Sequence, residues 1–147
     1  VIDTPDGRIV HTGDFKLDKT PLIGEGWDPV LWGEISKPGV KALVCDSTNV
    51  FSKTAGRSEA TLGDNITSLV ANAKQMVIAT TFASNLARVK TLADAGHRAG
   101  RSVCLMGRAM GRMVDAAKES GVLYDFPSTI SPSDRVAPLH KNTRNTS

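Results

Sequence analysis

Short apolar runs alternate with longer stretches of helical period over residues 39–132. The runs have the length and composition of buried strands, and they lie at 40–45, 76–80 and 102–106. In other segments apolar residues recur every three or four positions, which predicts amphipathic helices near 62–73, 84–97 and 110–117. Strands that alternate with helices of this length are typical of right-handed βαβ units. We therefore predict an α/β fold whose main domain is a three-layer, Rossmann-like parallel sheet.

The ends of the chain follow other patterns. Two short β-prone runs flank the turn sequence Thr4-Pro5-Asp6-Gly7, which predicts an N-terminal β-hairpin. The stretch from there to residue 38 has no clean period and predicts a long connection, with one helical turn near 29–35. We expect Ser58 to cap the first helix of the main domain and Gly121 to follow its last helix in a left-handed conformation. The predicted parts are thus 1–38 (hairpin and connection), 39–132 (α/β domain) and 133–147 (a frayed tail).

Charge and cysteine content narrow the class of protein only slightly. The 147 residues carry a net charge of +3 from 18 basic and 15 acidic side chains, which permits nucleic-acid binding without arguing for it. Six arginines fall in the middle of the chain, and their planar forks suit phosphate: Arg57, Arg88, Arg98, Arg101, Arg108 and Arg112. No apolar run approaches the length of a membrane span. Cys45 and Cys104 lie in predicted strands, which favours reduced core thiols and a cytoplasmic protein.

Polar side chains follow the predicted strands, at the edge of the sheet where ligands gather in parallel α/β folds. Hydroxyl, amide and guanidinium groups of this kind suit phosphate, especially beside helix N-termini. We predict that this edge binds anions through Asn49, Ser84, Asn85, Arg88 and Arg108. For any one serine or threonine at this edge, simple helix capping is an equally good interpretation.

Four short motifs resemble those of a known enzyme family. They are His11-Thr12-Gly13-Asp14-Phe15-Lys16, Cys45-Asp46-Ser47-Thr48-Asn49, Thr80-Thr81-Phe82-Ala83-Ser84-Asn85 with Arg88, and Met106-Gly107-Arg108-Ala109-Met110. Together they resemble ribonuclease J-like RNA nucleases, which combine a metallo-β-lactamase domain with a β-CASP domain. The resemblance implies that 1–38 is a remnant of the first domain and that 39–132 is the second.

The same resemblance implies roles for two carboxylates. Asp14 resembles the aspartate that bridges two zinc ions, and Asp46 resembles an acidic catalytic group beside those ions. A solvated or capping role for Asp46 is an equal alternative. The family's main metal motif, His-x-His-x-Asp-His, does not occur in the sequence. One recognisable ligand cannot hold zinc tightly, so we expect zinc in the complete enzyme and none in this chain alone.

The chain also begins at Val1 rather than methionine, and we expect it to be an internal fragment of the nuclease that clamps RNA but is inactive alone. Two alternatives stay open: a non-catalytic α/β module that binds phosphate or a nucleotide, and a self-associating module. In the second case the unpaired strand edges of the N-terminal hairpin would form a homodimer.

Overall fold

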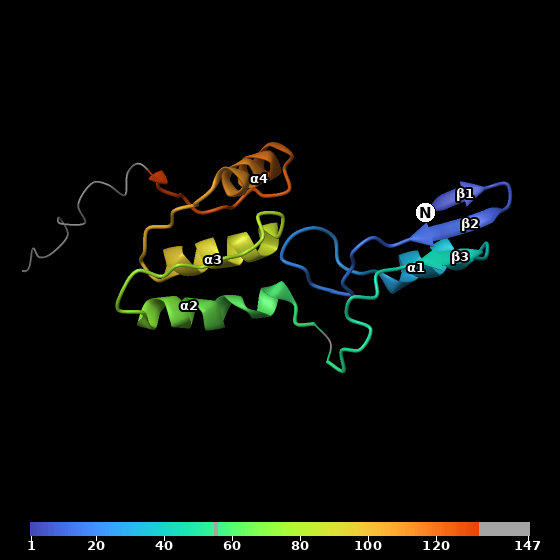
Figure 1. Cartoon of the computed structure of the whole chain (residues 1–147), viewed down its shortest axis with the longest axis horizontal. Helices are drawn as coiled ribbons and strands as arrows, with labels where there is room; N and C mark the ends of the chain where they lie inside the picture. The colour runs from blue at the N-terminus through green and yellow to red at the C-terminus, as the bar shows by residue number, and fades with distance from the viewer. Residues whose placement is uncertain (55, 133–147) are drawn as a thin grey trace, which may run out of the picture. The chain divides into compact units, whose positions relative to one another are not determined.

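The computed structural model describes residues 1–54 and 56–132 (Figure 1). These residues form four α-helices, one 3₁₀ turn and one three-stranded mixed sheet, so the predicted α/β class is confirmed. The chain divides into two compact units, Val1–Ser58 and Glu59–Ser147. The boundary between them lies within the connection that precedes the second helix.

The first unit is built on the predicted hairpin. Strands β1 (Ile2–Thr4) and β2 (Gly7–His11) pair antiparallel across a tight turn, as the Pro-Asp-Gly sequence predicts. Strand β3 (Ala42–Val44) lies parallel to β2 on its other side, which gives the order β1-β2-β3. The prediction of a strand in the run 40–45 is therefore confirmed, but its partner is the hairpin.

Helix α1 (Pro29–Ser36) completes this unit. Proline occupies its first turn, and the Asp28 carboxylate accepts a hydrogen bond from the backbone N–H of Val30 (2.8 Å). Arg8 on β2 donates from Nη1 to the carbonyl of Ile35 (2.7 Å), which ties the helix to the sheet. Val10 is the one buried residue among those that the structure describes in this unit.

The second unit holds the core. It contains the 3₁₀ turn η1 (Glu59–Thr61) and helices α2 (Gly63–Asn72), α3 (Leu86–Arg98) and α4 (Arg108–Glu119), so all three predicted helices are confirmed. Figure 1 shows α2 and α3 side by side, and they are packed against each other. The buried apolar residues of the second unit are Val70, Val89, Ala93, Ala95, Val114, Ala117 and Leu123. A Cβ on Gly96 would lie 2.7 Å from a methyl carbon of Val103, so this close approach requires glycine.

Two predicted helix ends have different outcomes. Gly121 has φ +72° directly after the C-cap of α4, as predicted. Ser58 does not cap α2, because the turn η1 lies between them and Leu62 occupies the N-cap position. The prediction for Ser58 was therefore wrong.

The predicted parallel sheet of the second unit is not present in the described residues. No strand is assigned at 76–80, and the run 102–106 contributes one parallel bridge, Cys104 to Ile130. An extended segment becomes a strand only when a neighbour completes its hydrogen-bond ladder, and Ile78 is instead 78% exposed. The prediction of a buried Cys45 was also wrong, because β3 and the residue after it are exposed; Cys104 is half-buried.

Across the described ranges, no helix has the length and apolar character needed to cross a bilayer.

Candidate functional site

Asp14 and Asp46 lie at the same edge of the first unit. Strands β2 and β3 are parallel, so the segments that follow them leave the sheet at the same edge, where both strands have their carboxyl ends. There the backbone N–H of Thr12 donates to the carbonyl of Val44 (3.0 Å), and the N–H of Asp46 donates to Oγ1 of Thr12 (3.4 Å). Asp14 is exposed at a bend just beyond β2, and Asp46 is half-buried. The structure thus brings together two motifs that are thirty residues apart in sequence.

The Asp46 carboxylate is held by a local turn. Its Oδ1 accepts one hydrogen bond from the hydroxyl of Thr48 (2.6 Å) and one from the backbone N–H of Thr48 (2.9 Å). The bond from the hydroxyl, with that from the N–H, lowers the pKa of Asp46 below its ordinary value. Asn49 follows in the next turn, where it is exposed. At neutral pH this edge therefore presents an ionised carboxylate, which attracts cations.

The residues around Asp14 do not complete a metal site. His11 is near in sequence, but its Nδ1 already accepts a hydrogen bond from the backbone N–H of Gly13 (3.0 Å). Over residues 1–54 and 56–132, no three His, Cys, Asp or Glu side chains gather closely enough to hold a metal ion. Zinc needs three or four protein ligands, so the described part of the chain does not fit that ion.

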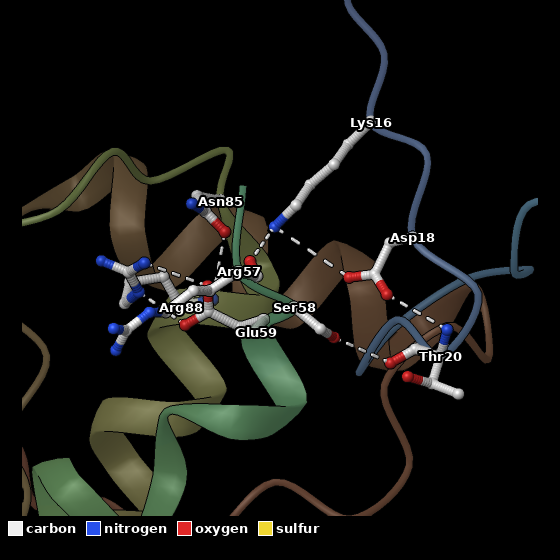
Figure 2. Close-up of polar contacts among 8 residues, drawn as sticks. All are labelled: Lys16, Asp18, Thr20, Arg57, Ser58, Glu59, Asn85 and Arg88. Atoms are coloured by element: carbon white, nitrogen blue, oxygen red, sulfur yellow. Dashed lines mark hydrogen bonds and ion pairs between the residues drawn. The ribbon is translucent and has the colours of Figure 1, made fainter. Parts of the chain in front are cut away.

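Three predicted anion-binding residues come together at the start of α3, and Figure 2 shows two of them, Asn85 and Arg88. Asn85 is the N-cap, and its Oδ1 accepts a hydrogen bond from the backbone N–H of Arg88 (3.0 Å). Ser84 and Asn85 are exposed, whereas the guanidinium of Arg88 faces Glu59. Arg88 donates from Nε to Oε1 (2.5 Å) and from Nη2 to Oε2 (3.0 Å), and these bonds raise the pKa of Arg88.

The other two predicted residues lie elsewhere. Arg108 is the exposed first residue of α4, after Gly107 with φ +99°. Asn49 belongs to the first unit. The convergence of all five side chains at one edge stays a prediction.

Sequence reasoning missed the contacts of Glu59 and Lys16. No binding role was predicted for Glu59, and nothing in its spacing from Arg88 indicates their pairing. Within the first unit, Lys16 donates to the carbonyl of Arg57, and the hydroxyl of Ser58 donates to the carbonyl of Thr20 (3.1 Å; Figure 2). Contacts over such distances in the chain depend on the fold and leave no local pattern.

Comparison with known proteins agrees with the motifs. Residues 74–144 match the family model described as "Ribonuclease J, beta-CASP domain". The chain is 41% identical over 123 residues to ribonuclease J of Sinorhizobium meliloti, covering 84% of this chain and 22% of that protein. It is 40% identical over 143 residues to ribonuclease J of Corynebacterium glutamicum, covering 95% and 20%. It is 36% identical over 151 residues to ribonuclease J of Mycolicibacterium smegmatis, covering 97% and 27%.

The chain therefore spans about a fifth to a quarter of the length of these relatives. The four motifs, the match over 74–144 and the similarity along most of its length together show that this chain belongs to the ribonuclease J family and contains β-CASP-domain sequence.

Proposed function

We propose that this chain is the RNA-binding portion of a ribonuclease J-like phosphodiesterase and that it does not cleave RNA alone. The observation that carries the proposal is the start of α3. Ser84, Asn85 and Arg88 lie within one turn there, and the backbone N–H groups of a helix N-terminus attract negative charge. An arginine fork beside such a terminus is suited to phosphate oxygens.

An aromatic side chain beside this position supports binding of single-stranded RNA. Phe82 is 82% exposed, and its carbonyl accepts the backbone N–H of Asn85 (3.0 Å), so the backbone of this residue adjoins the helix cap. Exposed rings stack on unpaired bases, while cationic groups contact the phosphates between them. We assign Arg108 and Asn49 to further phosphate contacts.

In the complete enzyme, Asp14 would be one of several zinc ligands and Asp46 a catalytic group beside the metal. This part of the proposal rests on the family resemblance, because the described residues alone do not fit zinc. We propose the three-layer parallel sheet and the domain boundaries 1–38 and 39–132 for that complete protein; the predicted tail, 133–147, lies outside the described residues. The parallel bridge between Cys104 and Ile130, where the Ile130 N–H donates to the carbonyl of Val103 (2.8 Å), supports such a sheet. We also assign the protein to the cytoplasm.

The test is the affinity of the full chain for a fluorescein-labelled, 5′-phosphorylated single-stranded oligoribonucleotide, measured by fluorescence anisotropy. Arg88→Ala should weaken binding by about threefold to tenfold at low salt, and the difference should shrink as salt screens the contact. Arg98→Ala is the matched control, because it removes the same charge from the far end of α3. Urea unfolding of each variant shows whether it remains folded. Equal affinity of Arg88→Ala and wild type at low salt would refute the binding site.

A homodimer formed through the first unit is a second proposal. β1 and β3 are the two edges of the sheet, and edge strands present unpaired backbone groups to other chains. Ile2 and Leu43 on these strands are 54% and 62% exposed, so a second copy would cover apolar surface as well. This proposal concerns assembly and is independent of RNA binding.

A further inference from the structure

Glu59 occupies the face of Arg88 that phosphate would need. The Nε and Nη2 groups of Arg88 form two parallel bonds to the two oxygens of one carboxylate. A guanidinium binds a phosphate through the same paired donors and in the same plane. Because the two ligands share that geometry, the carboxylate of Glu59 and a phosphate cannot both hold the Nε–Nη2 face.

The pair is better protected than the Arg98–Asp64 ion pair of the same helix. The Glu59 side chain is 12% exposed and that of Arg88 is 38% exposed. At the opposite end of α3, Arg98 and Asp64 form a single contact of 3.3 Å, and Asp64 is 99% exposed. Water screens that second pair almost completely, whereas it reaches Glu59 poorly. The Glu59 carboxylate is therefore a competitor that salt alone displaces weakly.

We propose that Glu59 acts as an internal phosphate mimic, which occupies the Nε and Nη2 donors of Arg88 until RNA displaces the Glu59 carboxylate. This inference rests on the RNA-binding function proposed above. The turn that carries Glu59 suits this role. It is a 3₁₀ segment of three residues, and the carbonyl of Glu59 accepts the N–H of Leu62 (3.1 Å). So short a segment has few backbone bonds to lose when it moves. The consequence is selectivity. Isolated phosphate does not break the Arg88–Glu59 ion pair, whereas single-stranded RNA that also stacks on Phe82 does.

The test compares the affinities of Glu59→Gln and wild type for the labelled oligoribonucleotide. Removal of the competing charge should tighten binding by about threefold to tenfold, the range over which ion pairs of this kind act. Asp64→Asn is the control, since it removes the same charge from the carboxylate that pairs with Arg98; it should change affinity by less than about twofold. In the double variant Glu59→Gln/Arg88→Ala the gain should vanish.

The outcomes separate the two proposals. If Arg88→Ala weakens binding but Glu59→Gln leaves it equal or weaker, Glu59 orients Arg88 and the mimic is refuted while the RNA site stands. If Glu59→Gln tightens binding by the same factor in the Arg88→Ala background, the gain in affinity comes only from the change in net charge, and the mimic is again refuted. If Arg88→Ala has no effect, the RNA site itself fails.

A second measurement is made on the wild-type chain and uses a variant only to assign a resonance. In the wild-type chain, the Nε–H resonance of Arg88, assigned by its loss in Arg88→Lys, reports whether the Glu59 pair is intact. It should shift and exchange faster with water on addition of the oligoribonucleotide, and should not respond to the same concentration of inorganic phosphate. A resonance that stays unchanged when RNA is bound would overturn the proposal.

Discussion

Replacing Lys90 with methionine should destabilise the second unit more than replacing any exposed charged residue of that unit. Lys90 lies on α3 with its side chain 9% exposed. Its Nζ contacts Asp94 Oδ2 at 2.8 Å and Asp125 Oδ2 at 3.2 Å, and it also donates to the carbonyl of Asp125 (3.2 Å). The lysine thus ties α3 to the segment that follows α4. Methionine refills the apolar volume but makes none of these bonds.

The magnitude follows from the exposure of each partner. A hydrogen bond to a charged group contributes about 1.5–3 kcal/mol where water is excluded. Asp94 is 29% exposed and approaches this case, whereas Asp125 is 72% exposed, so that pair is screened and contributes about 0–1 kcal/mol. After rehydration of the two carboxylates we expect a net loss of about 2 kcal/mol, a large part of the stability of an ordinary domain.

Urea unfolding of the full chain, followed by circular dichroism, measures the difference. Arg98→Met is the matched control: it also removes a cation from α3, but its pair with Asp64 is exposed, so it should cost less than about 0.5 kcal/mol. A Lys90→Met chain as stable as wild type, or an equal loss in the Arg98→Met control, would refute the reasoning.

The pH dependence gives a second check. Burial favours the neutral amine, but the bonds to Asp94 and Asp125 outweigh it, so the pKa of Lys90 lies above its ordinary value. A group with a raised folded-state pKa contributes stability below its unfolded pKa and loses it as the pH rises through the folded value. The difference between wild type and Lys90→Met should therefore be constant near neutrality and shrink above about pH 10.

Three further predictions concern the turn after α4, metal content and assembly. Gly121→Ala should lower the free energy of unfolding by about 1 kcal/mol, because φ +72° strains any residue with a Cβ; an unchanged urea midpoint would contradict this. The dialysed chain should retain less than stoichiometric zinc by elemental analysis and should not cleave 5′-phosphorylated RNA with added zinc or manganese. Retained zinc, with cleavage abolished by Asp14→Ala, would show a complete enzyme instead. Deletion of residues 1–16 should shift a dimer towards monomer in size-exclusion chromatography with light scattering, and a wild-type chain that is monomeric at high concentration would rule out the dimer.

Local patterns predicted the helices well because each is encoded within its own segment. The period of Val89 and Ala93 marks the buried face of α3, and Gly121 marks the end of α4. The turn sequence around Asp6 likewise places the hairpin. In all three cases the signal lies within a dozen residues of the structure that it specifies.

Pairing between distant segments was less predictable. The run 40–45 was recognised as a strand, but nothing local indicates that it would pair with β2 and leave Cys45 exposed. The run 76–80 has the composition of a strand, yet composition does not supply the neighbour that a ladder requires. The candidate site shows the same limit. Arg88 was found from its motif, whereas the carboxylate that binds it was not, because their pairing depends on how η1 contacts α3.

The solitary burial of Val10 has a consequence for the dynamics of the first unit. With one side chain sheltered from water in its described part, the unit has little cooperative resistance to opening, and its backbone hydrogen bonds face solvent on several sides. Its amide hydrogens should then exchange quickly through frequent local opening. The amide hydrogens of α3 should exchange more slowly, because their exchange requires rarer and more extensive unfolding. Any molecule that covers β1 or β3 would slow that exchange in proportion to how tightly it binds. Amide exchange in β2 is therefore a sensitive internal reporter of whatever this sheet pairs with.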